Sequence, residues 1–167
     1  MLHTLSRTQF LPLSLNAAWE FFSDPGNLCR ITPDWLCFRI TGQNPEPMYA
    51  GQILTYTIQP LPGLQTAWVT EITHVQKPGF FVDEQRLGPY ALWHHQHRFQ
   101  EEGGGVRMED LVSYALPLGL FGAAIHRLVV KRRLEAIFDY RYQVLEKMFP
   151  APGESGFPDV LEHYVAS

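Results

Sequence analysis

Residues 80–116 read FFVDEQRLGPYALWHHQHRFQEEGGGVRMEDLVSYAL, and this stretch decides the fold. Polar and apolar residues alternate over 80–87, 91–100 and 106–116, a period of two that is typical of strands with one buried face. The run of glycines after Glu101 and Glu102 indicates a hairpin between the second and third segments. Strands joined by such short connections must pair antiparallel, so the stretch predicts a meander.

Upstream of this stretch, the same alternation predicts four more strands, over residues 3–11, 36–41, 52–59 and 65–75. Between the first two we expect two short helices. The first runs through residues 17–22, where Ser14 or Asn16 can cap its N-terminus. Residues 24–27, Asp-Pro-Gly-Asn, then indicate a turn, and the second helix is expected over 28–31.

Downstream of Pro117 the hydrophobic period becomes helical, with Ile125, Leu128 and Val129 among the residues of one apolar stripe. A helix over residues 120–148 is about 43 Å long but only about 10 Å wide, so it crosses a whole sheet without covering it. The sheet must curl around it or leave a gap. We therefore predict an α+β helix-grip fold, in which a curved antiparallel sheet of about seven strands wraps a long C-terminal helix.

The sequence also carries a family resemblance. Its features are Asp83 and Gln85, the Gly88-Pro89-Tyr90 turn, residues 93, 95, 97 and 99 at every second position, and the run 137–141. They resemble a bacterial branch of the START-like superfamily, also called SRPBCC, which includes the pollen-allergen (Bet v 1-like) fold, lipid-transfer START domains and polyketide cyclase/dehydratases. The resemblance implies a deep cavity between sheet and final helix over residues 1–149, without implying one chemistry. Residues 150–167 are rich in Pro and Gly and are expected to form a tail.

Alternation assigns five polar residues to the inner face of the sheet: Asp83, Gln85, His95, His97 and Asp110. Burying them without partners would cost several kcal/mol, so they must satisfy one another, water or a ligand. Three interpretations remain open. The residues form a structural network, they orient a ligand, or they catalyse a reaction in which His95 or His97 is the general acid/base and Asp83 or Asp110 its orienting partner. A metal site has no independent support, and no cofactor is expected.

The same alternation selects the side chains that would line a ligand cavity. Any single one of these residues is expected to pack in the core. The hypothesis is that the group as a whole forms the wall of a cavity. Beside Asp83, Gln85, His95, His97 and Asp110, the candidate ligand-binding residues are Trp35, Phe38, Tyr56, Trp68, Trp93, Phe99, Val112, Tyr114, Ile125 and Val129.

Composition narrows the class of function. The net charge of −4 and the absence of a long basic run argue against nucleic-acid binding. Cys29 and Cys37 are too few for a disulfide framework, and Cys37 is expected to be buried as a small hydrophobe. The first ten residues do not resemble a signal peptide and no segment is apolar enough to span a membrane, so we expect a cytoplasmic location.

The expected function is the binding of a small hydrophobic molecule, such as a lipid, isoprenoid or polyketide, by a carrier or sensor. Two alternatives stay open. One is a cyclase/dehydratase-type enzyme that uses His95, His97, Asp83 and Asp110, and the other is a protein-interaction module with a vestigial cavity. Whether the protein is an enzyme is undecided, with binding favoured over catalysis.

Overall fold

The computed structural model describes residues 1–42, 47–117 and 129–151. In this part of the chain, seven strands form one antiparallel sheet in the order β1-β7-β6-β5-β4-β3-β2. The first strand therefore lies beside the last one, and the rest follow as a meander. The strands are β1 (Leu2–Leu11), β2 (Arg39–Ile40), β3 (Gln52–Leu61), β4 (Leu64–Gln76), β5 (Phe80–Leu87), β6 (Leu92–Glu102) and β7 (Gly105–Ala115).

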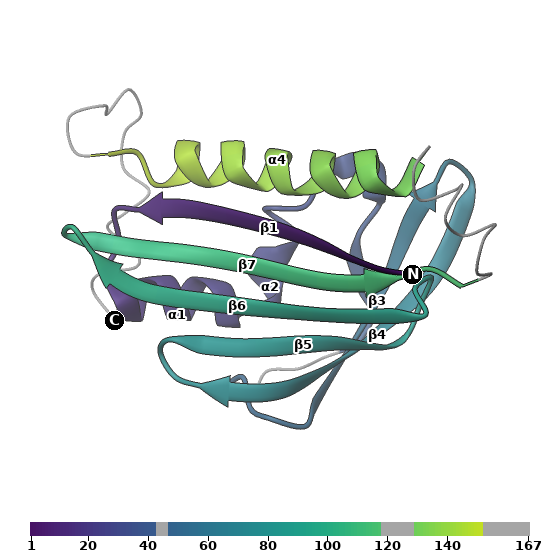
Figure 1. Ribbon diagram of the computed structural model, residues 1–167, viewed down its shortest axis with the longest axis horizontal. Helices are drawn as coiled ribbons and strands as arrows, with labels where there is room; N and C mark the ends of the chain where they lie inside the picture. The colour runs from purple at the N-terminus through teal and green to yellow at the C-terminus, as the bar shows by residue number, and fades with distance from the viewer. Residues whose placement is uncertain (43–46, 118–128, 152–167) are drawn as a thin grey trace.

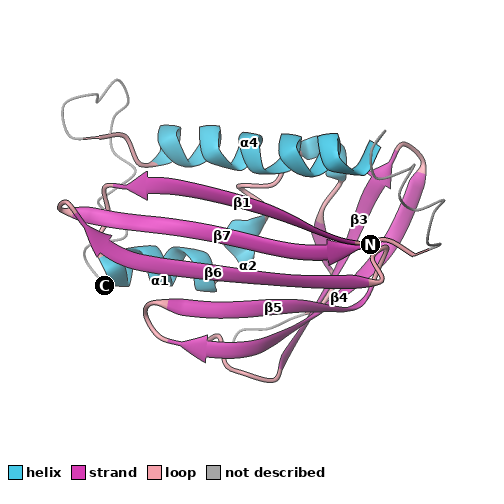
Figure 2. Cartoon of the chain, viewed as in Figure 1, coloured by secondary structure: helices cyan, strands magenta, loops and turns pink. Residues whose placement is uncertain are grey.

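The helices are α1 (Leu15–Ser23), α2 (Pro25–Leu28), the 3₁₀ helix η1 (Asp34–Leu36) and α4 (Lys131–Met148). In the view of Figure 1, α1 and α2 lie behind the strands and α4 runs along the sheet beside β1. Figure 2 shows β3 and β4 turning away from the plane of the other long strands. Two register shifts between β4 and β5 accompany this bend, since β-bulges increase local twist. The predicted α+β helix-grip fold is confirmed.

Capping residues determine where the two short helices begin. Ser14 caps α1, because its Oγ accepts a hydrogen bond from the backbone N–H of Ala17 at 3.2 Å. The second helix, predicted over 28–31, begins three residues earlier. Asp24 caps it by accepting from the Gly26 N–H at 2.8 Å, and Pro25 occupies its first turn. Asp, Pro and Gly are common both in turns and at the start of a helix. Residues 24–27 were therefore interpreted as a turn, although the helix already begins at Pro25.

The strand predicted over residues 36–41 is much shorter than expected. The strand itself holds only Arg39 and Ile40, because η1 occupies residues 34–36 and Cys37 adopts a left-handed conformation with φ of 47°. Cys37 is exposed, so its predicted burial is wrong. The chain thus reaches the sheet only briefly before it enters β3.

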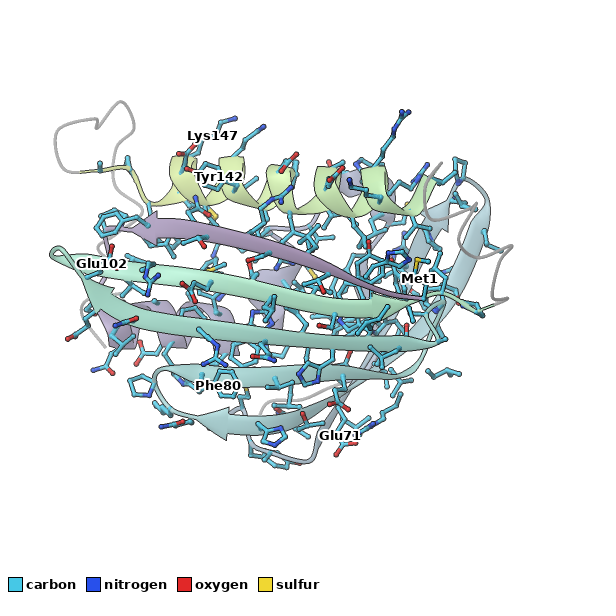
Figure 3. All side chains as sticks on the ribbon, in the orientation of Figure 1. Met1, Glu71, Phe80, Glu102, Tyr142 and Lys147 are labelled. Carbon is cyan, nitrogen blue, oxygen red and sulfur yellow. The ribbon has the colours of Figure 1, made fainter. Side chains whose placement is uncertain are left out.

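The C-terminal helix presents one buried stripe to the sheet. Its buried residues are Leu134, Phe138, Arg141 and Leu145, whose spacing of three or four places them on one side of α4. Lys147, labelled in Figure 3, is one of the exposed residues of this helix. The structure describes α4 from Lys131 and, before it, residues 129 and 130, so residues 120–128 of the predicted helix and the tail from residue 152 lie outside the described residues.

Buried apolar side chains form three clusters. The largest joins α1 to β5, β6 and β7 through residues such as Trp19, Phe81 and Phe99. A second joins β6 and β7 to α4, and the third lies on β3 and β4 around Leu54, Tyr56 and Ile72. Such a divided core is what a bent sheet produces when slender helices contact it in separate places. None of the described helices has the length and apolar character needed to cross a membrane.

Candidate functional site

A cavity of about 410 Å³ lies among these clusters. Side chains of β3 to β6 form its sheet wall, while α4, α2 and η1 provide the opposite side. Most of the lining is apolar or aromatic. Of the residues expected to line a cavity, the structure places nine on its wall: Trp35, Phe38, Tyr56, Trp68, Asp83, Trp93, His95, His97 and Val129.

Phe99, Val112 and Tyr114 are buried but do not line the cavity. They face inward as alternation predicts, yet helices cover them. Phe99 packs against Trp19 of α1 with ring centroids 6.5 Å apart, and Val112 and Tyr114 share a cluster with α4. Alternation identifies the inner face of a strand, but it does not tell where on that face a helix docks. Ile125 lies outside the described residues.

Gln85 does not join the polar cluster. Its amide braces the turn that follows β5, because Nε2 donates to the Tyr90 carbonyl at 2.7 Å and Oε1 accepts from the Tyr90 N–H at 3.2 Å. Tyr90 itself is a lining residue that alternation did not select. The role of Gln85 is therefore to hold Tyr90 in place, and it has no contact with the histidines.

The remaining four polar residues form a closed tetrad, which we call the His/Asp tetrad: Asp83, His95, His97 and Asp110. Strand register brings them together, since Asp83 lies opposite His95 and His97 lies opposite Asp110 in neighbouring strands. Asp83 Oδ2 is 3.1 Å from His95 Nδ1 and 3.0 Å from His97 Nε2. Asp110 Oδ1 is 3.0 Å from both His95 Nε2 and His97 Nδ1.

Aromatic rings border the tetrad. Trp93 donates its indole N–H to Asp83 Oδ1 at 3.3 Å, and the Phe81 ring stacks on His97 with centroids 4.0 Å apart. Asp110 is the deepest member, 2% exposed, and it does not reach the cavity wall, whereas Asp83 does. The tetrad thus spans from the cavity surface to the core behind it.

Burial and charge act against each other on the tetrad. Burial by itself lowers the pKa of His95, but the charge of Asp83 and the hydrogen bonds to both carboxylates outweigh it and raise this pKa to about 9. Burial likewise raises the pKa of Asp83 and Asp110, and the two histidines more than reverse it, so that both pKa values fall well below their ordinary range. A neutral imidazole has only one N–H, so the two carboxylate contacts of His95 also favour its charged form.

The tetrad offers little to acid–base chemistry. A general base needs a ring nitrogen within reach of the substrate, yet each of the four nitrogens lies 3.0–3.1 Å from a carboxylate oxygen. The contact of His97 Nδ1 with Asp110 lacks hydrogen-bond geometry, and this nitrogen is buried. Asp83, His95 and His97 also place one ligand atom each within 4.8 Å of one another, a spacing that a divalent metal ion could use. Metal binding there would have to displace the His–Asp83 contacts together with the imidazolium proton.

The alternation of the strands could not select the two arginines of the cavity wall, because Arg133 and Arg141 lie on α4. Arg133 is half-buried, and its guanidinium lies 5.0 Å from the ring centroid of Trp35, which is 42% exposed. Arg141 is buried. The stripe spacing of 134, 138, 141 and 145 could have found Arg141, since it places a cation among apolar residues.

No protein-family model matches the sequence, and no curated protein does either. Solved structures match over most of the chain. Protein CV1439 from Chromobacterium violaceum has a TM-score of 0.66 at 9% identity, covering 88% of this chain and 97% of its own. Protein Ms6760 from Mycobacterium smegmatis has a TM-score of 0.61 at 18% identity, covering 87% and 92%.

Ara h 8.0201, a protein with the Bet v 1-like fold, matches with a TM-score of 0.56 at 14% identity, covering 88% of this chain and 99% of its own. Identities this low establish the fold alone. The fold of these matching structures agrees with the family resemblance of residues 81–99 and with the observed order of strands and helices. The chain therefore has the helix-grip fold of the START-like, or Bet v 1-like, proteins.

Proposed function

We propose that the protein binds a small hydrophobic molecule in the cavity between the sheet and α4, as a carrier or sensor. The observation that carries this proposal is the cavity volume of about 410 Å³ beside a largely apolar and aromatic wall. Ligand pockets commonly measure roughly 300–1,000 Å³ and have a few polar groups in an apolar lining. Lipids, isoprenoids and polyketides are ligand classes of suitable size and polarity.

The polar residues on the wall suit recognition better than catalysis. Asp83 and the two histidines are held by one another, so a ligand would meet a fixed polar patch in an apolar surrounding. A cyclase/dehydratase reaction would require one histidine to leave this network. Native mass spectrometry of the freshly purified protein should show a co-purifying small molecule, and that molecule should be recovered chemically unchanged after incubation.

Filling the cavity should abolish binding without unfolding the protein. Ile137 lines the cavity from α4 and is half-buried, so Ile137→Trp places an indole in empty space. N-phenyl-1-naphthylamine, a neutral apolar probe that fluoresces when it leaves water, should bind the wild type with a Kd of about 10 μM or tighter. We expect Ile137→Trp to weaken this binding at least tenfold, at an unchanged melting temperature.

Ala136→Trp is the matched control, because residue 136 is the exposed neighbour of Ile137 on the same helix and does not line the cavity. It should bind the probe as the wild type does. Equal binding by wild type and Ile137→Trp would place the probe elsewhere and overturn the proposed cavity function.

A further inference from the structure

Arg141 is a buried cation on an otherwise apolar helix stripe. It is 8% exposed, and the other buried residues of α4 are Leu134, Phe138 and Leu145. Arg141 is one of the residues that line the cavity, and its guanidinium lies 5.0 Å from the ring centroid of Phe138, one turn earlier. A buried guanidinium is costly unless an anion and hydrogen-bond acceptors compensate it.

The described residues do not supply that compensation. The buried Nε of Arg141 has no hydrogen-bond partner, and no ion pair within 4 Å joins the guanidinium to an acid of the described chain. Asp110 borders a small void together with Arg141, but its Oδ1 already faces both histidines. Arg7, which also borders that void, pairs with Asp139 at 3.1 Å. The nearby acids are therefore engaged elsewhere.

The second arginine of the wall is in a different situation. Arg133 is half-buried and stacks over the exposed Trp35, so water can solvate its charge. Arg141 is less accessible to water than Arg133, and no acidic side chain of the described residues lies within 4 Å of its guanidinium. Among the described residues, Arg141 is therefore a buried cation of the cavity wall with no ion pair within 4 Å.

We propose that the ligand is an amphipathic carboxylate whose head group pairs with Arg141 while its apolar body fills the rest of the cavity. This inference rests on the proposed function and specifies the ligand class. A guanidinium offers a fork of N–H donors that matches a carboxylate in two parallel hydrogen bonds. A monovalent carboxylate balances one buried cation, whereas a phosphomonoester carries up to two charges and would leave an excess of negative charge.

Three ligands with the same alkyl chain test this assignment: decanoate, decan-1-ol and decyl phosphate, each measured by displacement of N-phenyl-1-naphthylamine at pH 7.5. The wild type should bind decanoate at least about tenfold more tightly than decan-1-ol, the preference expected of a charge-assisted hydrogen-bond pair in a buried site. Decyl phosphate should bind less tightly than decanoate. A tighter binding of decyl phosphate would overturn the choice of a carboxylate.

Arg141→Met should remove the preference for decanoate over decan-1-ol. Arg132→Met is the matched control, because Arg132 is exposed on the same helix and does not line the cavity, and it should keep the preference. Arg141→Met should also raise the melting temperature of the ligand-free protein, since it removes an uncompensated buried charge. Should this variant fail to fold, Arg141→Lys gives the same test, because a lysine lacks the bidentate fork and should reduce the preference several-fold.

The two proposals fail in different ways. If the wild type binds decanoate and decan-1-ol equally and Arg141→Met changes neither, the carboxylate assignment is wrong although the cavity still binds apolar molecules. If N-phenyl-1-naphthylamine and all three alkyl ligands fail to bind, the proposed function itself is wrong.

Discussion

Asp110→Asn should destabilise the protein by about 3–5 kcal/mol, the cost of removing one partner from a buried charged pair. Asp110 is 2% exposed, and its Oδ1 is 3.0 Å from a nitrogen of each histidine. Asparagine preserves the shape of the side chain but removes the negative charge, and its amide N–H₂ would oppose ring N–H donors. Urea unfolding of both proteins at pH 6, compared at equal m-values, measures the difference in the free energy of unfolding.

The opposite face of the same strands provides the control. Glu84 Oε1 is 2.9 Å from His94 Nδ1, so it forms a His–carboxylate pair across β5 and β6 like the pairs of the tetrad. Its side chain is 27% exposed and that of His94 32%, however, so water screens the pair. Glu84→Gln should cost about 1 kcal/mol or less. A similar small cost for Asp110→Asn would show that the tetrad contributes no more than a surface pair.

Period-two alternation predicted that the four residues of the tetrad, together with Gln85, face the inner side of the sheet. It assigned His95, His97 and Asp110 to the inner face of their strands, where all three are at most 7% exposed. The short β6–β7 hairpin then fixed the register that sets His97 opposite Asp110. Side-chain period and hairpin length are local properties of the chain, and for this reason they could be read from the sequence.

Properties that depend on tertiary packing were not predictable in the same way. Phe99 and Trp93 share one face of β6, yet Phe99 packs under α1 and only Trp93 reaches the cavity. Gln85, which alternation grouped with the histidines, instead hydrogen-bonds to Tyr90, because a turn only five residues away supplies both of its partners. Which polar side chain stays unpaired likewise depends on where every neighbour points, and Arg141 was found only from the structure.

The tetrad also connects stability to pH, because His95 binds its proton more tightly in the folded chain than in the unfolded one. Its pKa rises from 6.5 to about 9 on folding. Below pH 6.5 both states carry the proton and the contribution of His95 is complete. Between pH 6.5 and about 9 only the folded state retains it, so stability falls as the pH rises. Asp83 and Asp110 have lowered pKa values and act in the opposite sense, since their contribution is lost as the pH falls below about 4.

We therefore expect the free energy of unfolding of the wild type to fall by about 3 kcal/mol between pH 6.5 and pH 9, at about 1.4 kcal/mol per pKa unit of difference. His95→Gln should be less stable than the wild type at pH 6.5, because the carboxylates of Asp83 and Asp110 lose a shared cation. It should also show a much smaller fall over the same interval, so the two stability curves converge as the pH rises. Urea unfolding at pH 6.5, 7.5 and 9 measures both curves. Parallel curves for the two proteins would mean that His95 does not hold its proton more tightly in the folded state than in the unfolded one.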